Sequence, residues 1–209
     1  MKPEKRQEKL DRIVAAARSQ FQRFGYKRTS VEDVARKAHM GKATIYHYVS
    51  GKEELFQLYI QRAFEAYLTA LETAVSEEAS PPDKLLRCAQ ILVEHHTEAV
   101  GSLEIDWNDL EDEFPPIIKT LRRYRAAELA IIQKIIHEGN QTGYFQLDNE
   151  TLAAGLLQGA FGGMMAEICH THDNLNGEEV VTFFMKTLLE GLLVRPDAPN
   201  LPDAPNVEV

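Results

Sequence analysis

Residues 29–52 read TSVEDVARKAHMGKATIYHYVSGK, and this stretch decides the fold of the N-terminal part of the chain. Thr29 or Ser30 can cap a first helix, since an acidic residue follows each of them by three positions. After a tight turn at residues 39–41, residues 42–49 fit a second helix. The stretch therefore predicts two short helices joined by a turn.

The second of these helices has two chemically different sides when its residues are placed about 100° apart. The apolar side holds Ile45, Tyr48 and Val49, and the opposite side holds Lys42, Ala43, Tyr46 and His47. The opposite side suits the major groove of DNA, because Ala43 can touch a thymine methyl and His47 can bond a base edge. Lys42 and Tyr46 can reach phosphates. Thr44 lies in the first turn, where its hydroxyl and the free amides can bind another phosphate.

At these residues the chain resembles the TetR/AcrR family of transcriptional regulators. The matching stretches are Phe24-Gly25-Tyr26, Thr29-Ser30-Val31, Val34-Ala35, Ala38, the run from Lys42 to Tyr48, and Lys52-Glu53-Glu54-Leu55-Phe56. The resemblance implies sequence-specific binding of double-stranded DNA. The residues that it places on the DNA are Thr29 or Ser30, Lys42, Ala43, Thr44, Tyr46, His47 and Lys52. Two positions depart from the family pattern: His39 replaces a turn glycine, and Gly41 replaces a capping serine.

Charge is divided unevenly along the chain. The formal net charge is −9, but residues 1–53 hold 13 Lys and Arg against 6 Asp and Glu, a net charge of +7. Residues 54–209 hold 10 basic and 26 acidic residues, a net charge of −16. A basic head on an acidic body favours one docking orientation on a polyanion.

Apolar residues recur every three or four positions throughout, so we expect an all-α fold. A helix through residues 10–24 ends at Gly25, and Ser50 with Glu53 is expected to cap a long helix toward Ser80. About five further helices follow. We expect three parts: a three-helix DNA-binding domain at residues 1–53, a larger helical domain at residues 54–195, and a flexible proline-rich tail at residues 196–209.

The larger domain resembles the family's effector-binding and dimerisation domain, which implies a homodimer, a palindromic operator and a small-molecule effector. Candidate ligand-lining residues are Trp107, Phe114, Tyr124, Phe161, Met164 and Met165. Leu152, Leu156, Gly159, Gly163, Phe184, Leu188 and Leu192 are the candidates for the dimer interface, on two final helices at about residues 149–170 and 178–194. We expect an apolar or amphipathic effector that releases the operator. The acidic run at residues 104–113 favours cationic amphiphiles over fatty acyl compounds, although such a run also suits a solvated helix face.

Other classes of protein fit less well. Adjacent His95 and His96 point about 100° apart on a helix, so we expect no metal site, and we expect no cofactor. The sequence contains no nucleophile elbow and no phosphate-binding glycine loop, so it gives no indication of an enzyme. An architectural DNA binder would not need the acidic body, and only a regulator should protect a discrete palindrome. No apolar run suits a membrane span, and we expect a cytoplasmic protein in which Cys88 and Cys169 are free thiols.

Overall fold

The computed structural model describes residues 3–99, 115–170 and 176–192. Within these ranges the chain is helical and contains no β-strand. The helices are α1 (Pro3–Arg28), α2 (Val31–Lys37), α3 (Lys42–Tyr46), α4 (Lys52–Glu77), α5 (Pro81–Ala99), α7 (Pro115–Thr142), α8 (Glu150–His170) and α9 (Gly177–Leu192). The all-α prediction is confirmed, and none of the described helices is long and apolar enough to cross a membrane.

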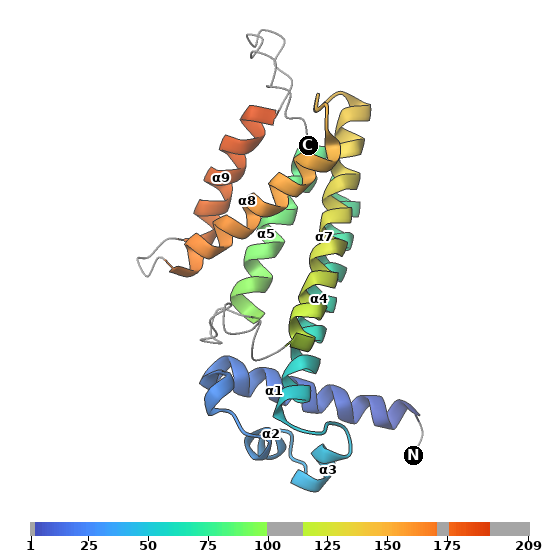
Figure 1. Ribbon diagram of the computed structural model, residues 1–209, viewed down its shortest axis with the longest axis vertical. Coiled ribbons are helices and arrows are strands. Elements are labelled where there is room, and N and C mark those ends of the chain that lie inside the picture. Colours follow the sequence, from blue (N-terminus) through green and yellow to red (C-terminus); the bar gives the residue numbers. More distant parts are fainter. Residues whose placement is uncertain (1–2, 100–114, 171–175, 193–209) are drawn as a thin grey trace.

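The first three helices form a small domain at one end of the molecule (Figure 1). α1 lies across the end of α4, and α2 and α3 lie on the far side of α1 from the body. The core of this domain consists mainly of buried side chains from α1 to α4, including Ile13, Phe21, Val34, Ile45 and Leu55, and Ile117 of α7 packs into it. An edge-to-face contact between the rings of Phe21 and Phe56, with centroids 5.1 Å apart, ties α1 to α4.

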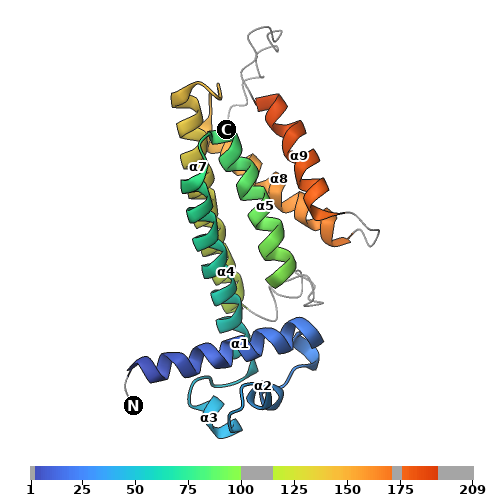
Figure 2. The same ribbon diagram turned by 180° about the vertical axis from the view of Figure 1, so that it is seen from behind.

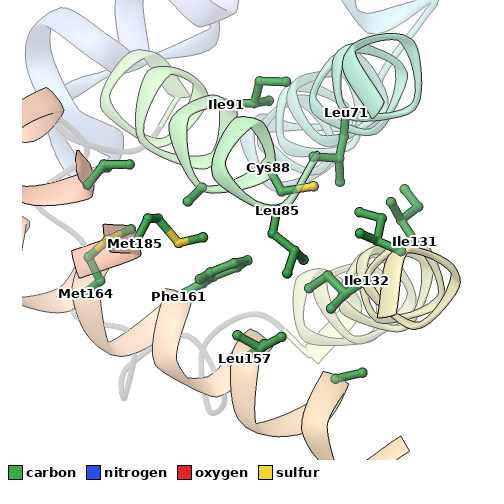
Figure 3. Packing of buried hydrophobic residues seen from close by; sticks show 14 of the residues in the cluster. Leu71, Leu85, Cys88, Ile91, Ile131, Ile132, Leu157, Phe161, Met164 and Met185 are labelled. Carbon is green, nitrogen blue, oxygen red and sulfur yellow. The ribbon is translucent and has the colours of Figure 1, made fainter. Parts of the chain in front are cut away.

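The body contains α5, α7, α8, α9 and the rest of α4, as the view from behind also shows (Figure 2). Leu85, Ile132 and Phe161 meet at its centre from α5, α7 and α8 (Figure 3). α4 contributes to both cores, since Leu55 and Tyr59 belong to the first and Leu71 to the second. The domain boundary expected at residue 53 thus falls inside the first turn of a continuous helix and remains a prediction.

Three local features follow from glycine residues. α1 bends at Gly25, whose φ of 74° lies in the left-handed region that favours glycine. After α7, Gly143 has a φ of 78° and the Phe145 amide donates to the Gly139 carbonyl at 3.1 Å. The Phe145 ring covers Gly139 so closely that a Cβ at that position would overlap it. This arrangement ends α7 and turns the chain toward α8.

The expected capping box of Ser50 and Glu53 is wrong. α4 begins at Lys52, so its N-cap is Gly51, and Glu54 is the third residue of the helix. The backbone amide and hydroxyl of Ser50 donate to the Glu54 carboxylate at 2.6 and 2.7 Å. These bonds hold the pKa of Glu54 below its usual range. A serine and a glutamate therefore do interact at the start of α4, but the glutamate is Glu54 and not the expected Glu53.

Candidate nucleic-acid interface

The start of α2 is fixed by a capping box. Ser30 is the N-cap: its hydroxyl oxygen accepts from the Asp33 amide at 3.2 Å, and its own amide donates to the Asp33 carboxylate at 3.1 Å. Hydrogen bonds from the Ser30 side chain and backbone lower the pKa of Asp33. Thr29 is buried, and its hydroxyl donates to the Gly25 carbonyl at 2.8 Å. Of the two residues expected near DNA, Ser30 is the cap and Thr29 holds the end of α1.

The turn between α2 and α3 is supported from α1. His39 has a φ of 54°, a left-handed conformation that is uncommon outside glycine. The Arg12 guanidinium donates to the Ala38 carbonyl at 2.8 Å, and the Met40 amide donates to the Ala35 carbonyl at 2.9 Å. Gly41 is the N-cap of α3 and makes no side-chain hydrogen bond. These two hydrogen bonds hold a turn that lacks the family's usual glycine.

α3 presents an exposed face of mixed chemistry. The helix ends at Tyr46 and not at Val49, so the expected helix was too long. Ile45 and Val49 are nevertheless buried and Tyr48 is half-buried. The exposed residues are Lys42, Ala43, Tyr46 and His47, with Thr44 half-buried at the flank. The structure brings these five residues together, and we call them the α3 face; their contact with DNA stays a prediction.

Lys42 and Lys52, the two lysines expected to contact DNA, already have protein partners. Lys42 pairs with Glu32 on α2, and both side chains are about half exposed. Such a surface pair contributes only about 0–1 kcal/mol, so a phosphate can replace Glu32 at little cost. The Lys52 ammonium donates to the Lys27 carbonyl at 3.1 Å and lies 4.2 Å from the centre of the Tyr26 ring. Partial burial lowers the pKa of Lys52, against the opposing effect of Glu53. Lys52 therefore joins α4 to the end of α1.

The expected ligand-lining residues that the structure describes are packed in the body. Phe161 and Met164 are buried in its core (Figure 3), and so is Met165. The Tyr124 ring stacks on Phe64 with centroids 5.0 Å apart. Trp107 and Phe114, with the acidic run at residues 104–113, lie outside the described residues. A cavity of about 290 Å³ lies elsewhere, between α1, α4 and α5, and is lined by residues that include Val14, Tyr59 and His95.

The candidates for the dimer interface separate into two groups. On α8, Leu152 and Leu156 are 58% and 66% exposed, and a Cβ at Gly159 or Gly163 would meet nothing within 4 Å. We call these four residues the α8 stripe. On α9, Phe184 and Leu188 are half-buried against the subunit's own core, and the side chain of Leu192 lies outside the described residues. One subunit leaves the stripe uncovered, whereas it partly covers the α9 candidates.

Some residues of interest were not expected from the sequence. Phe183 on α9 is 75% exposed, beside the half-buried Phe184 that was expected. Glu128 is buried in the body, where Tyr67 donates to one carboxylate oxygen and Gln158 donates to the other at 2.6 Å. Burial and the Glu128 charge raise the pKa of Tyr67. Glu128 falls on the apolar side of α7 with Ile132, four residues later, and that spacing was a usable signal.

No group of three or more His, Cys, Asp or Glu side chains is placed to hold a metal ion within the described part of the chain. Cys88 is a free thiol whose pKa burial raises to about 12. The side chain of Cys169 lies outside the described residues.

α3 is a short exposed helix of mixed polarity. It follows the capped helix α2 and a turn that is held by hydrogen bonds. This is the architecture of a helix-turn-helix DNA-binding domain.

Comparisons with known proteins agree with this architecture. Residues 13–59 match the bacterial regulatory proteins of the tetR family. An HTH-type transcriptional regulator of Bacillus subtilis, YhgD, is 23% identical over 184 residues, which cover 86% of this chain and 94% of that protein. A transcriptional regulator from Cytophaga hutchinsonii has the same fold, with a TM-score of 0.75 and 21% identity over 89% of this chain and 99% of that one.

A third similar protein is the transcriptional regulator FadR from Bacillus subtilis, whose structure was solved in complex with stearoyl-CoA. Its TM-score is 0.65 at 18% identity, covering 87% of this chain and 98% of that one. The N-terminal DNA-binding domain of the chain, at residues 13–59, belongs to the tetR family of bacterial regulatory proteins. The members of this family are DNA-binding regulators and not enzymes.

Proposed function

We propose that this protein is a repressor that binds a palindromic operator as a homodimer and leaves it when a small amphipathic effector binds. The single observation that carries the proposal is the α3 face: four of its five residues are exposed, at the tip of a domain with a net charge of +7. A helix of this kind enters the major groove and reads bases with its exposed side chains.

The α8 stripe supports the homodimer. Exposed leucines beside glycine backbones form an apolar strip that a solitary subunit leaves in water. A second copy of α8 could approach closely, because the glycines carry no side chains. A two-fold dimer presents its two α3 faces about 34 Å apart, or roughly one turn of the duplex. An inverted repeat with half-sites on one side of the DNA is the matching operator.

Selection of bound sequences from random duplexes tests the operator directly. We expect an inverted repeat whose half-sites are centred about one helical turn apart. A footprint on the selected duplex should cover both half-sites. Selected sequences without two-fold symmetry, or uniform binding to every duplex, would instead indicate an architectural DNA binder and would overturn the proposal.

We place the effector-binding site in the body, because its helices contribute no residue to the α3 face. Phe161, Met164 and Met165 supply apolar surface, and methionine side chains adapt readily to a bound molecule. These residues are buried, so binding among them must open the core. The stearoyl-CoA bound to FadR is amphipathic, but it is a fatty acyl compound and not a cationic amphiphile, so both classes are candidates here. Release requires that the effector favour a separation of the α3 faces unlike the DNA-bound one.

Binding linkage gives the test for the effector. Long-chain acyl-CoA thioesters and cationic amphiphiles are titrated against the protein with and without the selected operator. An effector that weakens operator binding must itself bind more weakly, by the same factor, when the operator is present. The proposal fails if compounds of both classes bind tightly while the affinity for the operator stays constant.

A further inference from the structure

Charges are segregated around the first turns of α1. At about 100° per residue, Lys5 and Lys9 lie within about 40° of each other. Arg6 and Arg12 flank them on either side. Glu4, Glu8 and Asp11 lie together on a different side of the helix. The first turns of α1 therefore have a basic side, formed by Lys5, Arg6, Lys9 and Arg12, and an acidic side.

Contacts at both sides determine how α1 is oriented. The Arg12 guanidinium bonds the Ala38 carbonyl in the turn before α3, and the Arg6 guanidinium carbon lies 6.0 Å from the centre of the Tyr48 ring. The basic side of α1 thus faces the helix-turn-helix. On the acidic side, Asp11 pairs with Arg62 of α4 at 3.2 Å. The acidic side therefore faces the body.

Lys5 and Lys9, also on the basic side, do not help to hold the domain together. Both side chains are exposed, and in the part of the chain that the structure describes neither has an acidic partner. Arg12, in contrast, is used to hold the turn. Exposed lysines on flexible stems next to a DNA-reading helix can reach the sugar-phosphate backbone without fixed geometry.

We propose that Lys5 and Lys9, on the basic side of α1, bind DNA phosphates outside the half-site that the α3 face reads. This inference rests on the proposed operator binding. The two lysines extend the contact along the duplex and add affinity but no base preference, because phosphates carry no direct sequence information. The acidic side of α1 is turned toward α4 and stays away from the DNA.

The test uses the full-length protein and the selected operator in two lengths. One duplex continues for about one helical turn beyond each half-site, and the other stops at the half-site edges. For the wild-type protein we expect tighter binding to the long duplex. Lys5→Ala/Lys9→Ala should remove most of this preference and reduce the slope of log affinity against log salt by about two per half-site, since each contact contributes about 0.9.

Lys134→Ala is the control, because it removes an exposed lysine from α7 in the body. It should leave the dependence on duplex length unchanged. If the double variant keeps the full preference for the long duplex, the lysines act only through long-range attraction and the inference is wrong. If the wild-type protein selects no operator at all, the proposed function fails instead. Both substitutions replace exposed helical residues with alanine, so helix content should be preserved.

Discussion

The α3 face and the α8 stripe are both surfaces that one subunit leaves exposed, but their chemistry differs. The α3 face consists of a cation, an imidazole, a phenol and small groups, which water solvates until DNA replaces it. The α8 stripe consists of Leu152, Leu156 and bare glycine backbone. Burying a leucine side chain contributes about 1.5–3 kcal/mol. We therefore expect the stripe to be covered permanently and the α3 face to be covered reversibly.

The largest expected effect comes from placing a charge in the stripe. Gly159→Arg adds a long cation where, among the described residues, the new Cβ would meet no atom within 4 Å beyond its own turn of α8, so the subunit itself should fold normally. Sedimentation should report a monomer. Operator affinity should fall by about 100-fold or more, because the second half-site is no longer tethered to the first.

Glu72→Arg is a matched control, since Glu72 is exposed on α4. It should leave the dimer and operator binding intact. Circular dichroism should show unchanged helix content in both variants. A Gly159→Arg protein that sediments as a dimer would refute the interface on α8.

Within the α3 face, two substitutions should have different effects. His47→Ala should cost about 1–3 kcal/mol at the preferred base pair and relax the preference at that position alone. Lys42→Ala should weaken all sequences alike and lower the salt slope by about one. Competition binding on single-base operator variants at several salt concentrations separates the two. Equal losses on every sequence for His47→Ala would show that His47 does not read a base.

Gly139 and Gly155 differ in burial: the first is buried in the subunit, and the second is exposed on α8. Gly155→Ala on α8 meets no atom within 4 Å, so it should raise helix stability by about 0.5–1 kcal/mol in a monomeric background such as Gly159→Arg. Gly139→Ala would collide with the Phe145 ring and should destabilise the fold. Urea unfolding of both proteins measures the two changes. Opposite signs are expected, and a destabilising Gly155→Ala would show that its surroundings within the subunit are crowded.

The smallest expected effect is at the cap of α2. The folded-state pKa of Asp33 is lowered by its hydrogen bonds with Ser30, so its contribution to stability is present above the unfolded value of 3.8 and is lost as the pH falls below it. Asp33→Asn should therefore lower the Tm by about 2 °C at pH 7, and the difference should shrink toward pH 3. Thermal unfolding across this range provides the measurement. A difference that is constant with pH would exclude the Asp33 charge as its cause.

The success of sequence reasoning differed between the two domains for physical reasons. In the first, local hydrogen bonding determines the structure, so the pairing of Ser30 with Asp33 and the exposed residues around Lys42 could be predicted. The cap at Ser50 was misplaced because the start of α4 depends on Gly51, which adopts an extended backbone. The hydrogen bond from Arg12 to Ala38 joins residues 26 positions apart, beyond the reach of local patterns.

In the body, helical periodicity predicted the last two helices closely, since α8 and α9 span Glu150–His170 and Gly177–Leu192. Periodicity could not separate residues buried in the subunit from residues that one subunit leaves exposed. Phe184 and Phe183 are neighbours of the same type, yet one packs on the core and the other is 75% exposed. Neighbouring residues on a helix point about 100° apart, and the packing of α9 on the core covers the side that holds Phe184.

In the proposed complex two subunits read one operator together, through α3 faces whose separation is set by pairing of the α8 stripes. The most direct test measures how many subunits bind a duplex with both half-sites, and compares its affinity with that of a duplex with one half-site. We predict two subunits on the complete operator and affinity at least about 100-fold higher than for the single half-site. One subunit on the complete operator, with equal affinity for both duplexes, would show that the protein does not bind its operator as a dimer.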